Sequence, residues 1–241
     1  MMPPLNATLP WVRVPAEGLT DTLKTITWQK TGEGSPAAGT AALMIYIAML
    51  MAQVERPRRI EFLGAEIDRI DHVAKITYDQ IAELTGLSRS LIRQGLMRLE
   101  STGLFSATGS RQNRCYVLKW EGLRWFKLPC RAIITKGEIT AFTTLTMRTK
   151  HELNALKLFL YLADVRDRNK DYTEASYEKI FERTGIPERD IRRAINVLNA
   201  CGLLAQVQRD SDREISSWGP NRYYLKEYKD LGFQRAVTQT Q

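Results

Sequence analysis

Two short runs of mostly polar side chains, each spaced as i, i+3, i+4 and i+7, are the residues best suited to contact another molecule. They are Ser90, Arg93, Gln94 and Met97 in the first run and Arg189, Arg192, Arg193 and Asn196 in the second. In a helix this spacing places the members of each run on one face. Arginine can donate two hydrogen bonds to O6 and N7 of guanine, and glutamine or asparagine can pair with N6 and N7 of adenine. The runs therefore predict two helices that read base edges in the major groove of double-stranded DNA.

Further polar residues flank these runs. Ser88 and Arg89 lie at the start of the helix that carries the first run. Arg89 and Arg98 are placed for phosphate contacts rather than base contacts. Loops that follow each helix supply further candidates, because arginine in such a loop can enter the minor groove or hold a phosphate. These loop candidates are Arg111, Asn113 and Arg114 in the first loop, and Arg209, Arg213 and Arg222 in the second.

The second of these loops allows two interpretations. It also carries Asp210, Asp212 and Glu214, which offset most of its attraction for DNA. Its greater length and Trp218 fit protein contacts equally well.

Catalytic signatures are lacking. His72 and His151 stand alone, and the three cysteines, Cys115, Cys130 and Cys201, have no paired spacing of a zinc site or disulfide framework. The sequence has no P-loop lysine motif, no G-x-G-x-x-G and no H-E-x-x-H. We therefore expect a protein that is not an enzyme, with no catalytic residue, metal, cofactor or small-molecule ligand.

An internal repeat positions the two runs. Tyr78–Phe105 aligns without gaps on Tyr177–Leu204, at an offset of 177 − 78 = 99 residues. Upstream, the apolar segment 42–50 resembles 155–163, and downstream Asn113–Tyr116 resembles Asn221–Tyr224. The chain therefore contains two copies of one structural unit.

Each copy predicts the same order of elements. An apolar helix and a short connection precede a second helix, which begins after Thr77 (with Gln80 at the capping-box spacing) or after Ser176. Gly86 or Gly185 forms a turn, and a third helix begins near Ser88 or Pro187. Two strand-like runs follow around a polar loop: Leu104–Thr108 with Cys115–Trp120, and Leu203–Gln208 with Arg222–Leu225. This is the order of a winged helix, so we expect a mainly helical α+β protein with two winged-helix domains in tandem.

Helical periodicity turns Ile92, Leu96 and Leu99 inward and leaves the polar run of the third helix outside. One position departs from the pattern. Phe181 in the second copy replaces the small Ala82, and a ring between the two helices predicts a distorted second motif.

We expect five segments along the chain. They are an N-terminal extension (1–36), a first winged-helix domain (37–120), a connector (121–150), a second winged-helix domain (151–230) and a tail (231–241). Within the connector, the threonine-rich run Ile139–Met147 resembles a strand.

Net charge and hydropathy indicate the kind of partner and the cellular location. Lys and Arg number 35 against 27 Asp and Glu, a net charge of +8 that favours polyanionic partners. The uncharged segment 35–54 has an apolar centre shorter than the roughly 20 residues that span a membrane. Its counterpart carries Lys157, so a buried helix is the better interpretation. With no signal peptide at its start, the chain is expected in the cytoplasm, associated with the nucleoid or a plasmid.

The tandem copies, with their repeated Ile-x-x-x-Thr-Gly-[Leu/Ile] and Leu-x-x-x-Gly-Leu-[Phe/Leu] patterns, resemble two-domain plasmid replication initiators over roughly residues 40–225. The resemblance implies sequence-specific DNA binding at repeated sites of an origin and recruitment of host replication proteins, with a second copy of the chain as another partner. A transcriptional repressor of a plasmid, phage or conjugative element is the alternative, and a winged-helix protein-interaction subunit is a third hypothesis.

Overall fold

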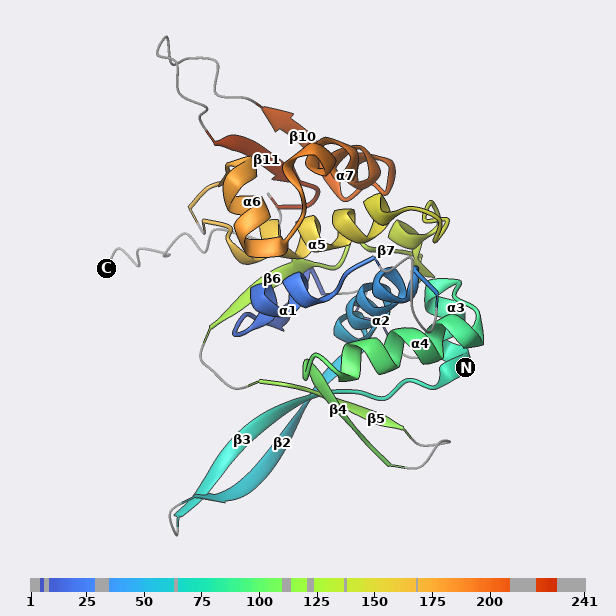
Figure 1. Cartoon of the computed structure of the whole chain (residues 1–241). Coiled ribbons are helices and arrows are strands. Elements are labelled where there is room, and N and C mark those ends of the chain that lie inside the picture. The colour runs from blue at the N-terminus through green and yellow to red at the C-terminus, as the bar shows by residue number, and fades with distance from the viewer. Residues whose placement is uncertain are drawn as a thin grey trace, which may run out of the picture.

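The computed structural model describes residues 5–6, 9–28, 35–62, 65–109, 114–120, 124–136, 138–167, 169–208 and 220–228. Over these residues the chain forms seven α-helices, one 3-10 helix and eleven strands, and the strands are arranged in small antiparallel sheets (Figure 1). The predicted α+β class, mainly helical, is confirmed.

The two sequence copies form corresponding elements. The first contains α2 (Ala38–Met51), α3 (Tyr78–Thr85), α4 (Arg89–Glu100), β4 (Phe105–Thr108) and β5 (Cys115–Leu118). The second contains α5 (Lys150–Asp164), β9 (Thr173–Ala175), α6 (Tyr177–Thr184), α7 (Glu188–Ala200), β10 (Leu204–Gln208) and β11 (Asn221–Leu225). In each copy a hairpin follows the third helix, β4 with β5 or β10 with β11.

Local signals in the sequence set the helix starts. Thr77 caps α3 in a capping box with Gln80, and the Ser88 side chain accepts a hydrogen bond from the amide of Leu91 at the start of α4. Gly86 and Gly185 follow α3 and α6 with φ angles of 69° and 70°, a left-handed conformation that favours glycine. The predicted helix–turn–helix boundaries are confirmed in both copies.

The expected distortion at Phe181 is wrong. Its side chain is 50% exposed, so the ring lies on the outer surface of α6 and not between α6 and α7. The two turns consequently keep matching geometry despite the exchange of Ala82 for a bulky residue.

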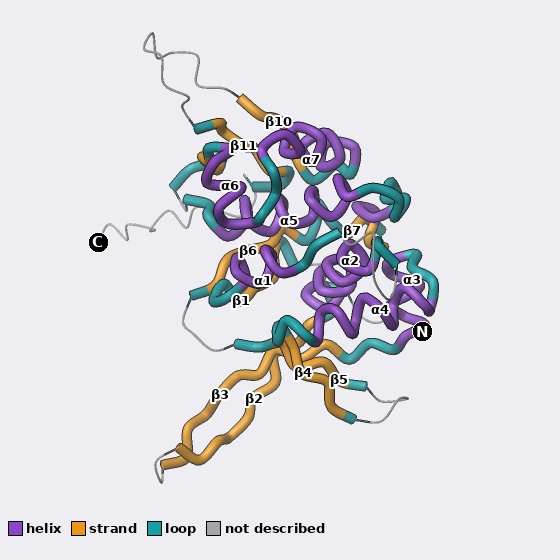
Figure 2. Tube along the Cα trace, in the orientation of Figure 1, coloured by secondary structure: helices purple, strands orange, loops and turns teal. Residues whose placement is uncertain are grey.

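A long two-stranded ribbon replaces the short connection that we expected after the first helix. β2 (Gln53–Phe62) pairs with β3 (Ala65–Ala74) over ten residue pairs, and the ribbon extends away from the helices (Figure 2). Cross-strand ion pairs support it, with Arg59 Nε 3.3 Å from an Asp68 carboxylate oxygen and Arg58 Nη1 3.6 Å from one of Asp71. β2 carries three arginines and β3 three acidic residues, and this complementary charge across the ribbon favours the pairing of the two strands.

Four helices stack in the order α7, α5, α2, α4, with the apolar first helices of the two copies in the middle (Figure 1). Every residue of α2 from Gly39 to Met51 is buried, and one apolar core runs through both copies. α2 is apolar on all sides because α4 covers one face and α5 another. None of the described helices combines the length and the apolarity that crossing a bilayer requires.

The segments outside the two copies pair with each other. β1 (Trp11–Pro15) lies antiparallel to β6 (Trp125–Pro129), and the rings of Trp11 and Trp125 stack with centroids 5.8 Å apart. After β1, α1 (Leu19–Thr25) packs against α6 of the second copy. The N-terminal segment is therefore an integral part of the fold.

The strand-like run expected at Ile139–Met147 is wrong for most of its length. β8 (Glu138–Ile139) pairs with β7 (Ile134–Thr135), and a 3-10 helix, η1 (Thr140–Phe142), follows at once. Ala141 and Phe142 are buried in the core, which favours the tight helical turn over an extended strand.

Buried Lys157 gives the fold a pH dependence. Its ammonium group donates to the carbonyl oxygen of Thr184 at 3.2 Å, and burial lowers its pKa to about 8. Above that pH the folded protein releases a proton that the unfolded chain retains, so the Lys157 contribution to the free energy of unfolding rises with pH up to the ordinary lysine pKa. Relative to Lys157→Met, wild type should gain about 1 kcal/mol between pH 7 and pH 9 in urea unfolding.

Wild type has to be compared with Lys157→Met because the buried thiols change the free energy of unfolding with pH in the direction opposite to Lys157. Burial raises the pKa of Cys130 to about 12. As pH rises above the ordinary thiol pKa, the unfolded chain loses this proton before the folded protein does, so the free energy of unfolding falls. This loss is common to wild type and Lys157→Met. A free-energy difference that stays constant from pH 7 to pH 9 would contradict the assignment to Lys157.

Candidate nucleic-acid interface

The polar run of α4 lies on its outer face, as the periodicity predicts. Ser88, Arg89, Ser90, Arg93 and Met97 are all exposed. On the opposite side Ile92, Leu96 and Leu99 are buried against the core. Burial of that stripe fixes which side chains α4 can present to a partner.

A hollow of about 1060 Å³ lies beside α4, lined by Arg89, Arg93 and Arg114 together with Asp79 and other residues. Arg114 directly precedes β5, so the hollow joins α4 to the hairpin that follows it. Three arginines and one aspartate around one hollow favour an anionic occupant such as a DNA phosphate.

Asp79 and Arg89 form an exposed ion pair at this hollow, with a carboxylate oxygen 2.6 Å from Arg89 Nη2. The carboxylate competes with any incoming phosphate for the same guanidinium group. Asp79→Asn should therefore raise the affinity for a random duplex by about threefold at low salt, the scale of an exposed ion pair. Fluorescence anisotropy would measure the change.

A matched control for this variant is Asp21→Asn. Asp21 forms an exposed pair with Lys24 on α1, 3.5 Å apart, so its loss makes the same change in net charge. Equal effects of the two variants would contradict a local role of Asp79.

Gln94 and Arg98 have partners in the N-terminal part of the chain. The amide of Ser35 donates to Gln94 Oε1 at 2.6 Å, and Gln94 is only partly exposed. Arg98 Nη2 donates to the carbonyl oxygen of Thr25 at 3.3 Å and contacts Thr27 Oγ1 at 3.2 Å. Both side chains tie α4 to the segment before α2, so Gln94 is less available to a base than its neighbours.

The polar run of α7 is exposed in full. Its members are Arg189, Arg192, Arg193 and Asn196. Ile191, Ala194, Ile195 and Leu198 are buried beneath them, so the inward and outward faces match those of α4. Three cationic side chains and one amide therefore share one surface of the second copy.

Residues of α5 that the sequence did not single out position this surface. Lys150 Nζ lies 2.6 Å from a carboxylate oxygen of buried Asp190 and so anchors the first turn of α7. His151 Nε2 lies 3.5 Å from Arg193 Nη1, and burial lowers the pKa of His151, which favours an uncharged ring beside the arginine. These partners lie about forty residues apart in sequence, so no local pattern could have indicated them.

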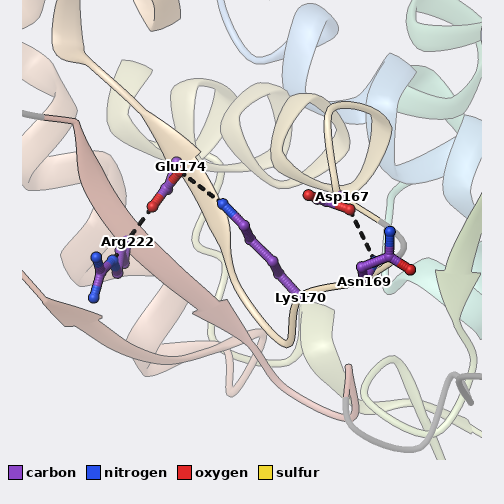
Figure 3. A network of polar contacts seen from close by, with 5 residues as sticks. All are labelled: Asp167, Asn169, Lys170, Glu174 and Arg222. Atoms are coloured by element: carbon purple, nitrogen blue, oxygen red, sulfur yellow. Dashed lines mark hydrogen bonds and ion pairs between the residues drawn. The ribbon is translucent and has the colours of Figure 1, made fainter.

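Arg222 belongs to a polar network across the strands of the second copy (Figure 3). Its Nε lies 3.3 Å from one Glu174 oxygen, while Lys170 Nζ lies 3.1 Å from the other, and both contacts lower the pKa of Glu174. The Arg222 guanidinium also lies 5.2 Å from the centroid of the Tyr172 ring. Arg222 therefore holds β11 to β9, and its guanidinium group is engaged within the fold.

The remaining loop candidates, Arg111, Asn113, Arg209 and Arg213, lie outside the described residues, as do Trp218 and the tail 231–241. Within the described parts of the chain, no group of three or more His, Cys, Asp or Glu side chains is placed to hold a metal ion. The structure thus brings together Arg89, Arg93 and Arg114 in the first copy and the four-residue run of α7 in the second.

Comparisons with protein-family models, with curated proteins and with solved structures gave no match to this chain.

Proposed function

We propose that the chain is a sequence-specific double-stranded DNA-binding protein made of two winged-helix units in tandem, with α4 and α7 as recognition helices. The observation that carries this proposal is the recurrence of one arrangement in both copies. In each, the third helix buries an apolar stripe, exposes a polar run, and is followed by a hairpin. Arg93 and Arg192 occupy the same aligned position in the two runs.

We further propose that the protein is a replication initiator of a plasmid or mobile element, acting in the cytoplasm with host replication proteins or a second copy as partners. The two exposed runs differ in sequence, so one chain can read an asymmetric site without forming a symmetric dimer. Covalent linkage of two such modules also raises the affinity of the pair. Direct repeats of an asymmetric site are the kind of target that such a chain would occupy.

Selection of bound fragments from random and source-genome DNA, at near-physiological salt, tests this function. Directly repeated asymmetric sites clustered in one region support the initiator. A single operator that overlaps a promoter supports a transcriptional repressor instead. If no sequence is enriched, specific DNA recognition is refuted.

A further inference from the structure

The two exposed runs differ in chemistry at aligned positions. The aligned pairs are Ser90 with Arg189, Arg93 with Arg192, Gln94 with Arg193, and Met97 with Asn196. Only the Arg93–Arg192 position is shared. The two halves of a DNA site should therefore share one type of contact and differ in the others.

Met97 is the apolar member of its run, and its side chain is 60% exposed. It is not required for the core, because the inward face of α4 is already formed by buried Ile92, Leu96 and Leu99. Among the large hydrophobic side chains exposed in the described residues, Met97 is the one carried by α4 or α7. It lies one helical turn beyond Arg93, on the same face.

The major groove offers an apolar side chain one distinctive feature, the C5-methyl group of thymine. Methionine is unbranched and polarizable and can adjust to such a contact. Gln94, the neighbour that could have paired with adenine, is already bound to the amide of Ser35. On α7 the equivalent positions carry Arg193 and Asn196, both exposed, which suit guanine and adenine.

We propose that Met97 is a specificity-determining residue that contacts a thymine methyl group, in a composite site whose α4 half contains this thymine and whose α7 half contains guanine. The inference rests on the proposed DNA-binding function and names the bases that each half reads. It predicts an asymmetric DNA target in which removal of one thymine methyl group weakens binding through the loss of its contact with α4.

The test uses the full chain and the duplex obtained by the selection described above. Each thymine is replaced in turn by deoxyuridine, which removes the C5-methyl group and leaves the hydrogen-bonding edge unchanged. Fluorescence anisotropy gives the Kd for wild type, Met97→Ala and the control Ile70→Ala, an exposed apolar residue on the ribbon. We expect one or two thymines whose replacement weakens wild type and Ile70→Ala about fourfold, the scale of one buried methyl group, and does not weaken Met97→Ala further.

Two results would overturn the inference while leaving DNA recognition intact. One is a selected site in which no deoxyuridine changes the Kd, and the other is sensitivity that persists in Met97→Ala. A guanine-free site would contradict the α7 half of the inference in the same way. Failure to select any site would refute the proposed function itself, and the inference with it.

Discussion

Replacing both Arg192 and Arg193 by alanine should weaken binding to the selected site by about 100-fold or more and leave the thermal unfolding midpoint nearly unchanged. The two guanidinium groups are exposed on α7, and an arginine that pairs with guanine contributes about 1–3 kcal/mol of discrimination. Neither side chain belongs to the buried stripe that holds the helix, so stability should change by no more than about 0.5 kcal/mol. Anisotropy on specific and random duplexes, with calorimetry of the free protein, measures both quantities.

A variant with the same loss of charge separates recognition from general attraction. Lys24→Ala combined with Arg131→Ala removes two exposed cations, one from α1 and one from the turn after β6. We expect only a small, sequence-independent loss of affinity for this control. Unaltered specific affinity in the Arg192/Arg193 variant would remove α7 from the proposed interface.

Gly95→Val should lower the free energy of unfolding by about 3 kcal/mol or more. A Cβ atom at Gly95 would lie 2.8 Å from Ile45 Cδ1 and 3.1 Å from the backbone carbonyl carbon of Ala41, so α4 could accept it only by moving away from α2. Gly95→Ala should be milder, because its gain in helix propensity offsets part of the clash. Urea unfolding of the three proteins would establish this order.

Ser90→Val is the control for the effect of a β-branched residue in the same helix. Ser90 is exposed, so this substitution changes helix propensity without crowding α2, and it should cost no more than about 0.5 kcal/mol. Equal stability of Gly95→Val and Ser90→Val would show that α4 does not depend on this close approach.

Much of the local structure is predictable from the sequence, because it depends on neighbouring residues. The caps at Thr77 and Ser88 and the buried stripe of α4 follow from capping chemistry and from helical periodicity. The hairpins after α4 and α7 follow from short β-like runs around polar loops. These features determine which faces of α4 and α7 are exposed. They therefore determine most of the residues of the candidate interface.

The features that the sequence did not predict depend on distant partners. β1 pairs with β6 across the whole first copy. The described residues between α5 and α6 form no ribbon like that of β2 and β3, so the repeat could not indicate it. Gln94 and Arg222 are predicted DNA contacts from helix face and loop position, and the sequence indicates no partner within the chain for either. Their partners, Ser35 and Glu174, lie 59 and 48 residues away in sequence, beyond the reach of any periodic pattern.

The pairing of β1 with β6 bears on how the protein is made. Arg13 is opposite Lys127, so the first strand leaves the ribosome 127 − 13 = 114 residues ahead of its partner, about 6–23 s at usual rates of elongation. During that interval α2, which is wholly buried in the finished protein, also lacks α5, which is synthesised later still. A nascent chain stopped within the first copy would present an uncovered apolar helix and is a natural substrate for chaperones.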